Sequence, residues 1–243
     1  MTEPPQGPPR WSPPPPSAPF QVGGALNWAF QKFGQHWQVL VVGMLPAVLV
    51  GIGFYAGYLA LFLPVWLNGV EGETTSNAAM LDLFQRIGLL YAGLLLLKIP
   101  LSVVHANLVR AALMIADGET PTMRMLVSTR RAGRIMLTSF VLLLCTLVGM
   151  VLCYLPGLAF SAFAFFTLPF LLDQDLKTWA AIKASFSLVR AHLGISLLTA
   201  LVVVVITSVG SMACLVGLVA SVPIGLLAQV YAYRALTHGR VVP

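Results

Sequence analysis

Four polar side chains, Tyr91, Lys98, Ser102 and His105, recur at helical spacing inside a long apolar stretch. Their positions i, i+7, i+11 and i+14 place them on one face of a single helix. An ammonium and an imidazole on a shared face are suited to contact an anion or a lipid headgroup. If this stretch spans a bilayer, its lysine costs at least about 2.5 kcal/mol and needs a partner.

The sequence leaves the partner of Lys98 open. No Asp or Glu lies deep in any other apolar stretch. Pro100 removes the hydrogen bond normally made to the carbonyl of Leu96, so that carbonyl is free to accept from the ammonium. A water-filled crevice or a lipid phosphate would serve equally well. The alternative to a binding site is a structural lysine that snorkels to the interface or is satisfied by backbone at the proline kink.

A second candidate set is a basic loop. Its arginines, which would contact lipid headgroups, are Arg124, Arg130, Arg131 and Arg134. Such a loop can attract anionic headgroups at roughly 1 kcal/mol per charge. Alternatively, its positive charge serves only to set the orientation of the protein in the membrane, since positive loops stay on the cytoplasmic side. The two interpretations are compatible.

Signatures of catalysis are missing from the chain. We find no G-x-S-x-G, H-E-x-x-H, P-loop or C-x-x-C pattern, so we predict no enzyme activity, catalytic residue, metal site or cofactor. Asp173 and Asp175 are explained as caps at the start of a helix. The three cysteines, Cys145, Cys153 and Cys214, lie in apolar runs and are interpreted as small buried packing residues.

The elements that carry these residues are long apolar segments separated by basic ones. Lys and Arg are absent from 33–85, 135–176 and 191–233. The chain of 243 residues is 58% hydrophobic and only 9% charged, whereas a soluble domain carries about 25% charged residues. The pattern predicts an integral membrane protein whose basic loops lie on one side. The net charge of +6 is then explained by the membrane, and nucleic acid is not an expected partner.

The predicted fold is an all-α membrane protein with six transmembrane helices. We expect the spans near 39–63, 85–113, 135–154, 157–172, 195–214 and 216–235, within a membrane domain over 20–236. A tight turn at 154–157 should join the third and fourth spans. Residues 1–19 are Pro-rich and should form a disordered cytoplasmic tail, and 237–243 a short second tail. The positive-inside rule puts both termini in the cytoplasm of a bacterial cell, with the first span uncleaved.

Amphipathic helices should lie on the cytoplasmic face. Two apolar stripes share the same spacing, Leu26/Phe30/Phe33/Trp37 and Ile182/Phe186/Val189/Leu193, and each leads into a span. His36 and His192 occupy matching positions. A weaker third copy runs over 120–134, with Thr120 as a helix cap and Pro121 at the first helical position. The implied unit is an interfacial helix followed by a helical hairpin, used three times.

Two segments carry a resemblance to a known group. Phe20–Trp37 is similar to the first helix of poorly characterised bacterial six-span proteins, and Leu168-Pro169-Phe170 with Asp173, then Ala181–Ser185 before Arg190, resembles their second recurring segment. These proteins are similar to the membrane domain of some glycerophosphoryl diester phosphodiesterases. The soluble phosphodiesterase domain is not part of this chain. The resemblance therefore implies a bacterial plasma-membrane protein and supplies no catalytic residues.

Two functions follow as hypotheses. The first is a non-catalytic integral membrane protein that organises lipid or an unknown partner protein at the cytoplasmic leaflet. The alternative is a small transporter or lipid-handling protein that uses the face of Lys98 and His105. A cavity reaching Lys98 would favour the alternative, whereas a tightly packed bundle would favour the organising role.

Overall fold

A computed structural model gives the fold and describes residues 22–68, 77–126, 128–129, 131–212 and 214–242. Within these residues the protein is helical and contains no strand. The helices are α1 (Val22–Asn68), α2 (Asn77–Asp117), α3 (Met123–Leu126), α4 (Ala132–Leu152), α5 (Tyr154–Phe163), α6 (Thr167–Asp173), α7 (Thr178–Ala191), α8 (Leu193–Met212) and α9 (Cys214–Leu236). The predicted tail over 1–19 lies outside the described residues.

Six helical segments are long and apolar enough to cross a membrane. They are Val22–Ala60, Leu96–Asp117, Ala132–Leu152, Tyr154–Asp173, Leu193–Met212 and Gly217–Leu236. Each overlaps one of the six predicted spans. The prediction of an all-α protein with six apolar helices of membrane-spanning length is therefore confirmed.

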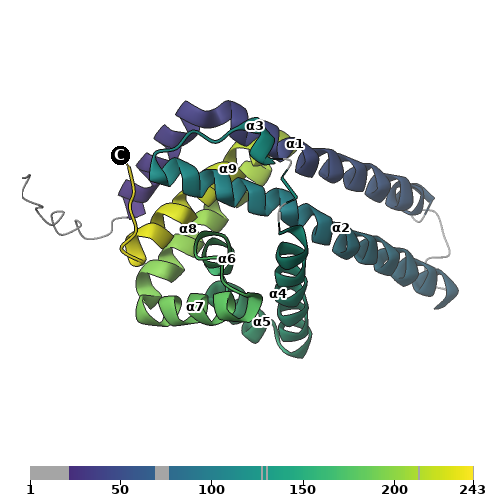
Figure 1. The fold of residues 1–243 in the computed structure, drawn as a ribbon. Coiled ribbons are helices and arrows are strands. Elements are labelled where there is room, and N and C mark those ends of the chain that lie inside the picture. The colour runs from purple at the N-terminus through teal and green to yellow at the C-terminus, as the bar shows by residue number, and fades with distance from the viewer. Residues whose placement is uncertain (1–21, 69–76, 127, 130, 213, 243) are drawn as a thin grey trace, which may run out of the picture.

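The long helices pair as three hairpins, α1 with α2, α4 with α5 and α8 with α9, which diverge from a shared end (Figure 1). The core lies where α1 and α2 meet α9. Its fully buried side chains include Leu40 from α1, Leu108 from α2, and Leu227 and Tyr233 from α9. The first long helix thus packs directly against the last one.

The outer surfaces of the hairpins are apolar. Leu49 and Leu89 are each 67% exposed, and Val151 and Met212 are each 86% exposed. The distal halves of α1 and α2 extend away from the other helices as one arm (Figure 1). Exposing so many apolar side chains to water is unfavourable, whereas exposing them to lipid is not. The apolar surface of the hairpins is therefore consistent with helices that can cross a membrane.

The backbone breaks at the two histidines that the sequence pairs. Inside α1, His36 has φ −121° and ψ 20°, and this kink divides α1 into two helices. His192 has φ −132° and ψ 47° and separates α7 from α8. The same side chain therefore marks the junction between two helices in both copies of the predicted unit.

The prediction of a third copy of that unit, over 120–134, is wrong. Thr120 and Pro121 lie outside any helix, and only the single turn α3 follows them. Gly118, with φ +85°, terminates α2 in a conformation that favours glycine. The buried Asn107 amide then donates to the carbonyls of Leu126 and Ser128, at 2.8 and 3.1 Å. These bonds hold the segment against α2 as a loop.

The joint between the third and fourth spans also differs from the prediction. Tyr154 and its three successors form the first turn of α5, and the extended backbone of Cys153 alone separates α4 from α5. The two helices approach closely where Gly149 faces Gly157. A Cβ on Gly149 would lie only 2.7 Å from Cα of Gly157, so the absence of a side chain allows the hairpin to close. Cys153 is exposed here, so its interpretation as a buried residue is wrong. The fourth span itself is two helices, α5 and α6, interrupted at 164–166.

Candidate functional site

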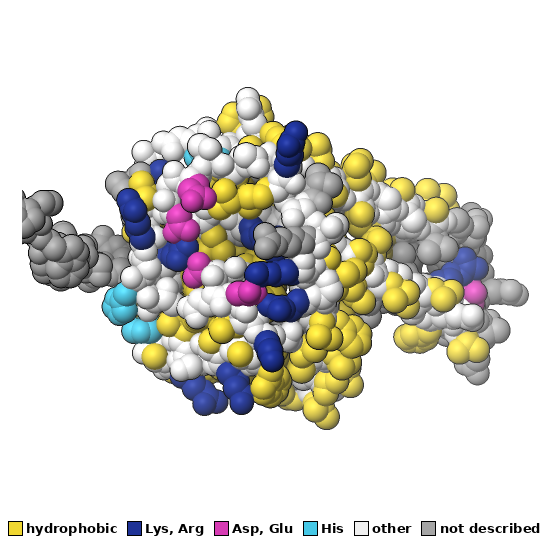
Figure 2. Space-filling model, viewed as in Figure 1, with side chains coloured by type: hydrophobic (Ala, Val, Ile, Leu, Met, Phe, Trp, Pro, Cys, Tyr) yellow, Lys and Arg dark blue, Asp and Glu magenta, His cyan; other side chains and the backbone are white. Residues whose placement is uncertain are grey.

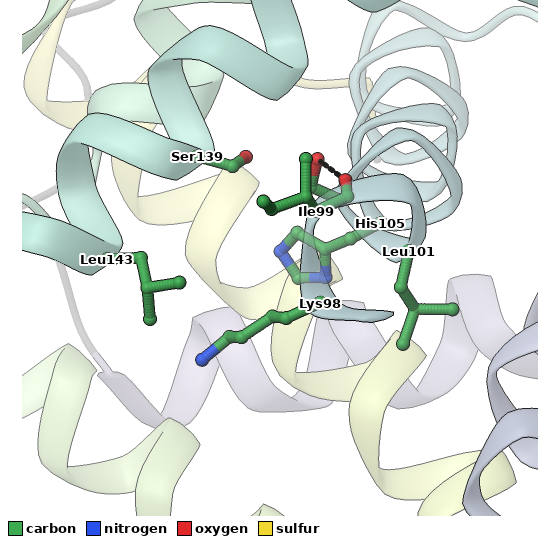
Figure 3. Close-up of a pocket in the computed structure, with 7 residues that line it drawn as sticks. Lys98, Ile99, Leu101, His105, Ser139 and Leu143 are labelled. Atoms are coloured by element: carbon green, nitrogen blue, oxygen red, sulfur yellow. Dashed lines mark hydrogen bonds between the residues drawn. The ribbon is translucent and has the colours of Figure 1, made fainter. Parts of the chain in front are cut away.

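A groove opens between α2 and α4 and encloses about 280 Å³. Its lining residues are Lys98, Ile99, Leu101, Ser102, His105, Ser139 and Leu143 (Figure 3). Three of the four polar residues that the sequence places on one helical face thus share a groove. α4 supplies the opposite wall. Tyr91 lies on α2, but its side chain is outside the described part of the structure.

Lys98 is the charged group of the groove. Its side chain is exposed and extends across the groove on the side where Leu143 lies (Figure 3). Within the described residues, no hydrogen bond or ion pair satisfies its ammonium. Of the partners that the sequence leaves open for Lys98, the carbonyl of Leu96 is thus not bonded to the ammonium in the structure. An ammonium in apolar surroundings needs an anion or water, so the groove has room and charge for a ligand.

The neighbouring polar groups leave acceptor and donor capacity in the groove. The Ser102 hydroxyl donates to the carbonyl of Ile99 at 2.5 Å, so its proton is used within α2 while its oxygen can still accept. His105 is exposed and lies one turn beyond Ser102, in the part of the groove that Ile99 also lines (Figure 3). Together with Lys98 they form a polar strip inside an apolar groove.

Two arginines of the basic loop form ion pairs within the protein. Arg131 and Arg134 both contact Oδ1 of Asp175 at 2.6 Å, which ties the start of α4 to the segment before α7. One carboxylate thus offsets half of their charge. Arg124 is exposed on α3, and Arg130 lies outside the described residues. Arg131 and Arg134 thus hold the start of α4 against the segment before α7. Their pairing with Asp175 leaves less positive charge available to lipid headgroups.

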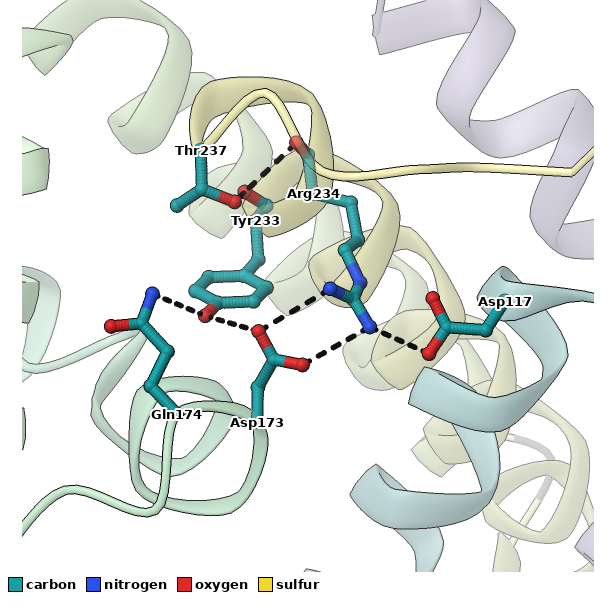
Figure 4. A network of polar contacts seen from close by, with 6 residues as sticks. All are labelled: Asp117, Asp173, Gln174, Tyr233, Arg234 and Thr237. Atoms are coloured by element: carbon teal, nitrogen blue, oxygen red, sulfur yellow. Dashed lines mark hydrogen bonds and ion pairs between the residues drawn. The ribbon is translucent and has the colours of Figure 1, made fainter.

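A polar network joins the ends of three helices and was not predicted (Figure 4). The guanidinium of Arg234, on α9, contacts Asp117 at the end of α2 at 2.7 Å and Asp173 at the end of α6 at 3.1 Å. The Tyr233 hydroxyl donates to Asp173 at 2.8 Å and accepts from the Gln174 amide at 3.3 Å. The Arg234 and Asp173 side chains are only 13% and 20% exposed, whereas Asp117 is 40% exposed, so the network lies at the surface with its arginine largely covered.

The interpretation of Asp173 and Asp175 as caps is wrong. Asp173 is the last residue of α6 and binds α9, whereas Asp175 binds the two arginines at the start of α4. The residue before α7 is Lys177, and no side-chain cap bond is found there. A sequence signal for the network exists. Asp117, Asp173 and Arg234 each lie near the end of an apolar helix, and opposite charges at such ends can pair when those ends meet.

Charged side chains gather on one face of the molecule. Figure 2 shows Lys, Arg, Asp and Glu side chains together over the shared end of the hairpins. The exception in this view is the far tip of the arm formed by α1 and α2. There Arg86 and Asp82 form an exposed ion pair at 2.7 Å. The charged side chains seen in this view thus lie mainly at the shared end of the hairpins, whereas the hairpins themselves are largely apolar on their surface.

Sequence comparisons give relatives without an assigned activity. The chain is similar to mycobacterial proteins. It is 29% identical to uncharacterised proteins of Mycobacterium tuberculosis and Mycobacterium bovis, over 95% of its own length and 75% of theirs. No protein-family model matches the chain, and no solved structure matches it. The similarity to the phosphodiesterase membrane domain therefore stays a prediction.

Proposed function

We propose that this is a multi-pass plasma-membrane protein that binds an anionic amphiphile in the groove between α2 and α4 and handles it without a chemical reaction. The observation that carries the proposal is the exposed Lys98 ammonium, which lacks a protein partner among the described residues and shares an apolar groove with Ser102 and His105. The anion of the ligand would meet the ammonium. The apolar part would lie along Leu101 and Leu143.

The depth of the groove supports handling of the ligand over simple adhesion. Ser139 and Leu143 follow the first residue of α4, Ala132, by seven and eleven positions. At 1.5 Å per residue they lie about 10 and 16 Å along the helix from its basic end. If that end marks the membrane surface, an anion in the groove has left the headgroup layer. A site that only organises headgroups would not need such depth.

The geometry gives less support to an organising role for the basic loop. Such a role needs cations that are free to meet headgroups. Arg131 and Arg134 are engaged by Asp175, and this contact has a structural purpose of its own. Lipid handling through the groove is accordingly the function that we place first.

The proposed topology has both termini in the cytoplasm and the charged end of the molecule at the inner surface. The first part of α1 and all of α7 would lie at the membrane interface, with the apolar face of α7 packed against the rest of the molecule and its polar face toward the headgroups. The gathering of charge at one end supports this orientation (Figure 2). Nucleic acid has no part in it, since the basic residues flank apolar helices.

Cysteine accessibility tests the topology. In a variant whose native cysteines are replaced by serine, Leu81→Cys near the tip of the arm should react with a membrane-impermeant maleimide in intact cells. Arg240→Cys should react only after the cells are opened, because the charged end faces the cytoplasm. Labelling of Arg240→Cys in intact cells, with Leu81→Cys protected, would contradict the proposed orientation.

Substitution of Lys98 tests the groove. Native mass spectrometry of the full chain in mild detergent should show that lyso-phosphatidylglycerol is retained more than lyso-phosphatidylcholine. Lys98→Met should lower the occupancy of the anionic lipid about fivefold, since one contact with a cation contributes roughly 1 kcal/mol. Binding of the choline lipid should not change.

The matched control is Arg86→Met, which removes a cation from the same helix outside the groove. It should leave both occupancies unchanged. If Lys98→Met retained the anionic lipid as the parent does, or if Arg86→Met reduced it equally, the groove would not be the site. Lys98 would then be a residue that the membrane merely accommodates.

A further inference from the structure

A second crevice, separate from the groove, opens between α4, α5 and α7 and encloses about 500 Å³. Its lining residues are Cys145, Phe160, Trp179, Ile182, Lys183, Phe186, Ser187 and Arg190. We propose that this crevice binds an anionic phospholipid of the surrounding bilayer. The headgroup would lie on α7, and one acyl chain would lie between α4 and α5.

The polar lip of the crevice comes from one face of α7. Lys183, Ser187 and Arg190 follow each other at i, i+4 and i+7, which aligns them along the helix. All three are exposed, and the crevice has no acidic lining residue. In the described part of the chain, neither Lys183 nor Arg190 forms an ion pair with a carboxylate. Two free cations with a hydroxyl between them are complementary to a phosphodiester.

Trp179 positions one end of this lip. The Lys183 ammonium lies 5.9 Å from the centre of the Trp179 ring, within the range of a cation–π contact. The indole is 62% exposed, as expected of a tryptophan at the boundary between headgroups and acyl chains. The contact holds the ammonium beside the opening of the crevice.

The floor of the crevice is aromatic and apolar. The Phe186 ring lies 5.6 Å from that of Phe160 and 5.3 Å from that of Phe163, measured between centroids. Ile182 is buried below the lip, and Cys145 contributes the wall from α4. Exposed apolar side chains cover the tip of the hairpin of α4 and α5, among them Val151, Leu152 and Leu155. An acyl chain entering the floor would therefore stay in contact with apolar surface along its length.

The opposed faces of α7 favour a lipid over a protein partner. Ala181, Ile182, Ser185 and Val189 are buried against the rest of the molecule, while the lip residues point outward. Figure 2 shows Lys and Arg side chains beside hydrophobic ones along the lower edge, where α7 and α5 lie in Figure 1. A cationic strip directly above an apolar crevice matches the two ends of one phospholipid. The crevice shares no residue with the groove of Lys98, so the two sites stand independently.

The test uses the full chain reconstituted in nanodiscs of phosphatidylcholine and phosphatidylglycerol. After gentle release from the discs, native mass spectrometry should show that phosphatidylglycerol is enriched among the retained lipids. All proteins in this test carry Lys98→Met, so that the groove contributes no preference for the anionic lipid. The double variant Lys183→Met/Arg190→Met should then lower the enrichment about 25-fold, because both cations of the lip are lost at roughly 1 kcal/mol each. The control Lys177→Met/Arg240→Met removes the same charge from exposed positions outside the crevice and should keep the enrichment.

A third variant separates a defined site from general attraction. Cys145→Trp fills the crevice from its α4 wall but keeps every charge, and it should lower the enrichment by at least threefold. Equal losses in the lip variant and in the control would reduce the effect to net charge and overturn the proposal. Unchanged enrichment in Cys145→Trp would overturn the acyl-chain position. Lack of any preference in the parent protein, with a co-purified protein on α7 instead, would show that the face serves a protein partner.

Discussion

Replacement of Arg234 by methionine is expected to lower the free energy of unfolding by about 2 kcal/mol, because it leaves the half-buried carboxylate of Asp173 and the more exposed one of Asp117 without their shared cation. Arg234 bridges Asp117 and Asp173, which end two different helices, and its side chain is only 13% exposed. The thermal midpoint of the protein in mild detergent, followed by size-exclusion chromatography, should fall clearly. No lipid-binding residue is altered by this change.

Two further variants define what the Arg234 measurement means. Arg240→Met removes an exposed cation from the same end of the molecule and should leave the midpoint unchanged. The combined variant Asp117→Asn/Asp173→Asn/Arg234→Met should regain much of the loss, since the unpaired charges are gone. A midpoint of Arg234→Met equal to that of the parent would show that the network does not hold the three helices together.

The second large effect is expected at the break in the fourth span. Ser185 on α7 is fully buried, and its hydroxyl donates to the carbonyl of Phe163 at 2.7 Å and accepts from the amide of Phe166 at 3.1 Å. Ser185→Ala leaves both backbone groups without these partners in apolar surroundings. We expect a loss of about 3 kcal/mol, measured by the same thermal assay.

Ser187→Ala is the natural comparison, since it makes the same change two residues later on the exposed face of α7. It should leave the midpoint close to that of the parent. If Ser185→Ala were equally harmless, then Gln229, whose amide donates to the carbonyl of Phe165, would suffice to support the break. In that case Ser185 would not be needed there.

The six apolar helices could be predicted because hydrophobic length and the placement of cations are properties of the chain alone. The shared face of Lys98, Ser102 and His105 could be predicted for a similar reason, since one helix fixes their spacing. The other wall of the groove could not. Ser139 and Leu143 carry no local signal, and only packing between α2 and α4 brings them to the site.

The break at 164–166 shows the limit most clearly. The interrupted segment, Ala-Phe-Phe, contains neither glycine nor proline, so nothing local indicates that the helix stops. Two of its backbone groups, the amide of Phe166 and the carbonyl of Phe165, are satisfied by Ser185 of α7 and Gln229 of α9, which are distant in sequence. The same applies after α2, where the predicted helix over 120–134 does not form and the Asn107 amide on α2 bonds instead to the carbonyls of Leu126 and Ser128.

The packing of α1 against α9 has a consequence for biosynthesis. The Trp28 indole on α1 donates to the carbonyl of Val242 at 2.9 Å, and the amide of Val242 donates to the carbonyl of Ala116 at the end of α2. The ribosome delivers residue 242 more than a hundred positions after α2 has left it. The earliest hairpin must therefore remain without its final neighbour until translation has supplied α9 and the residues after it.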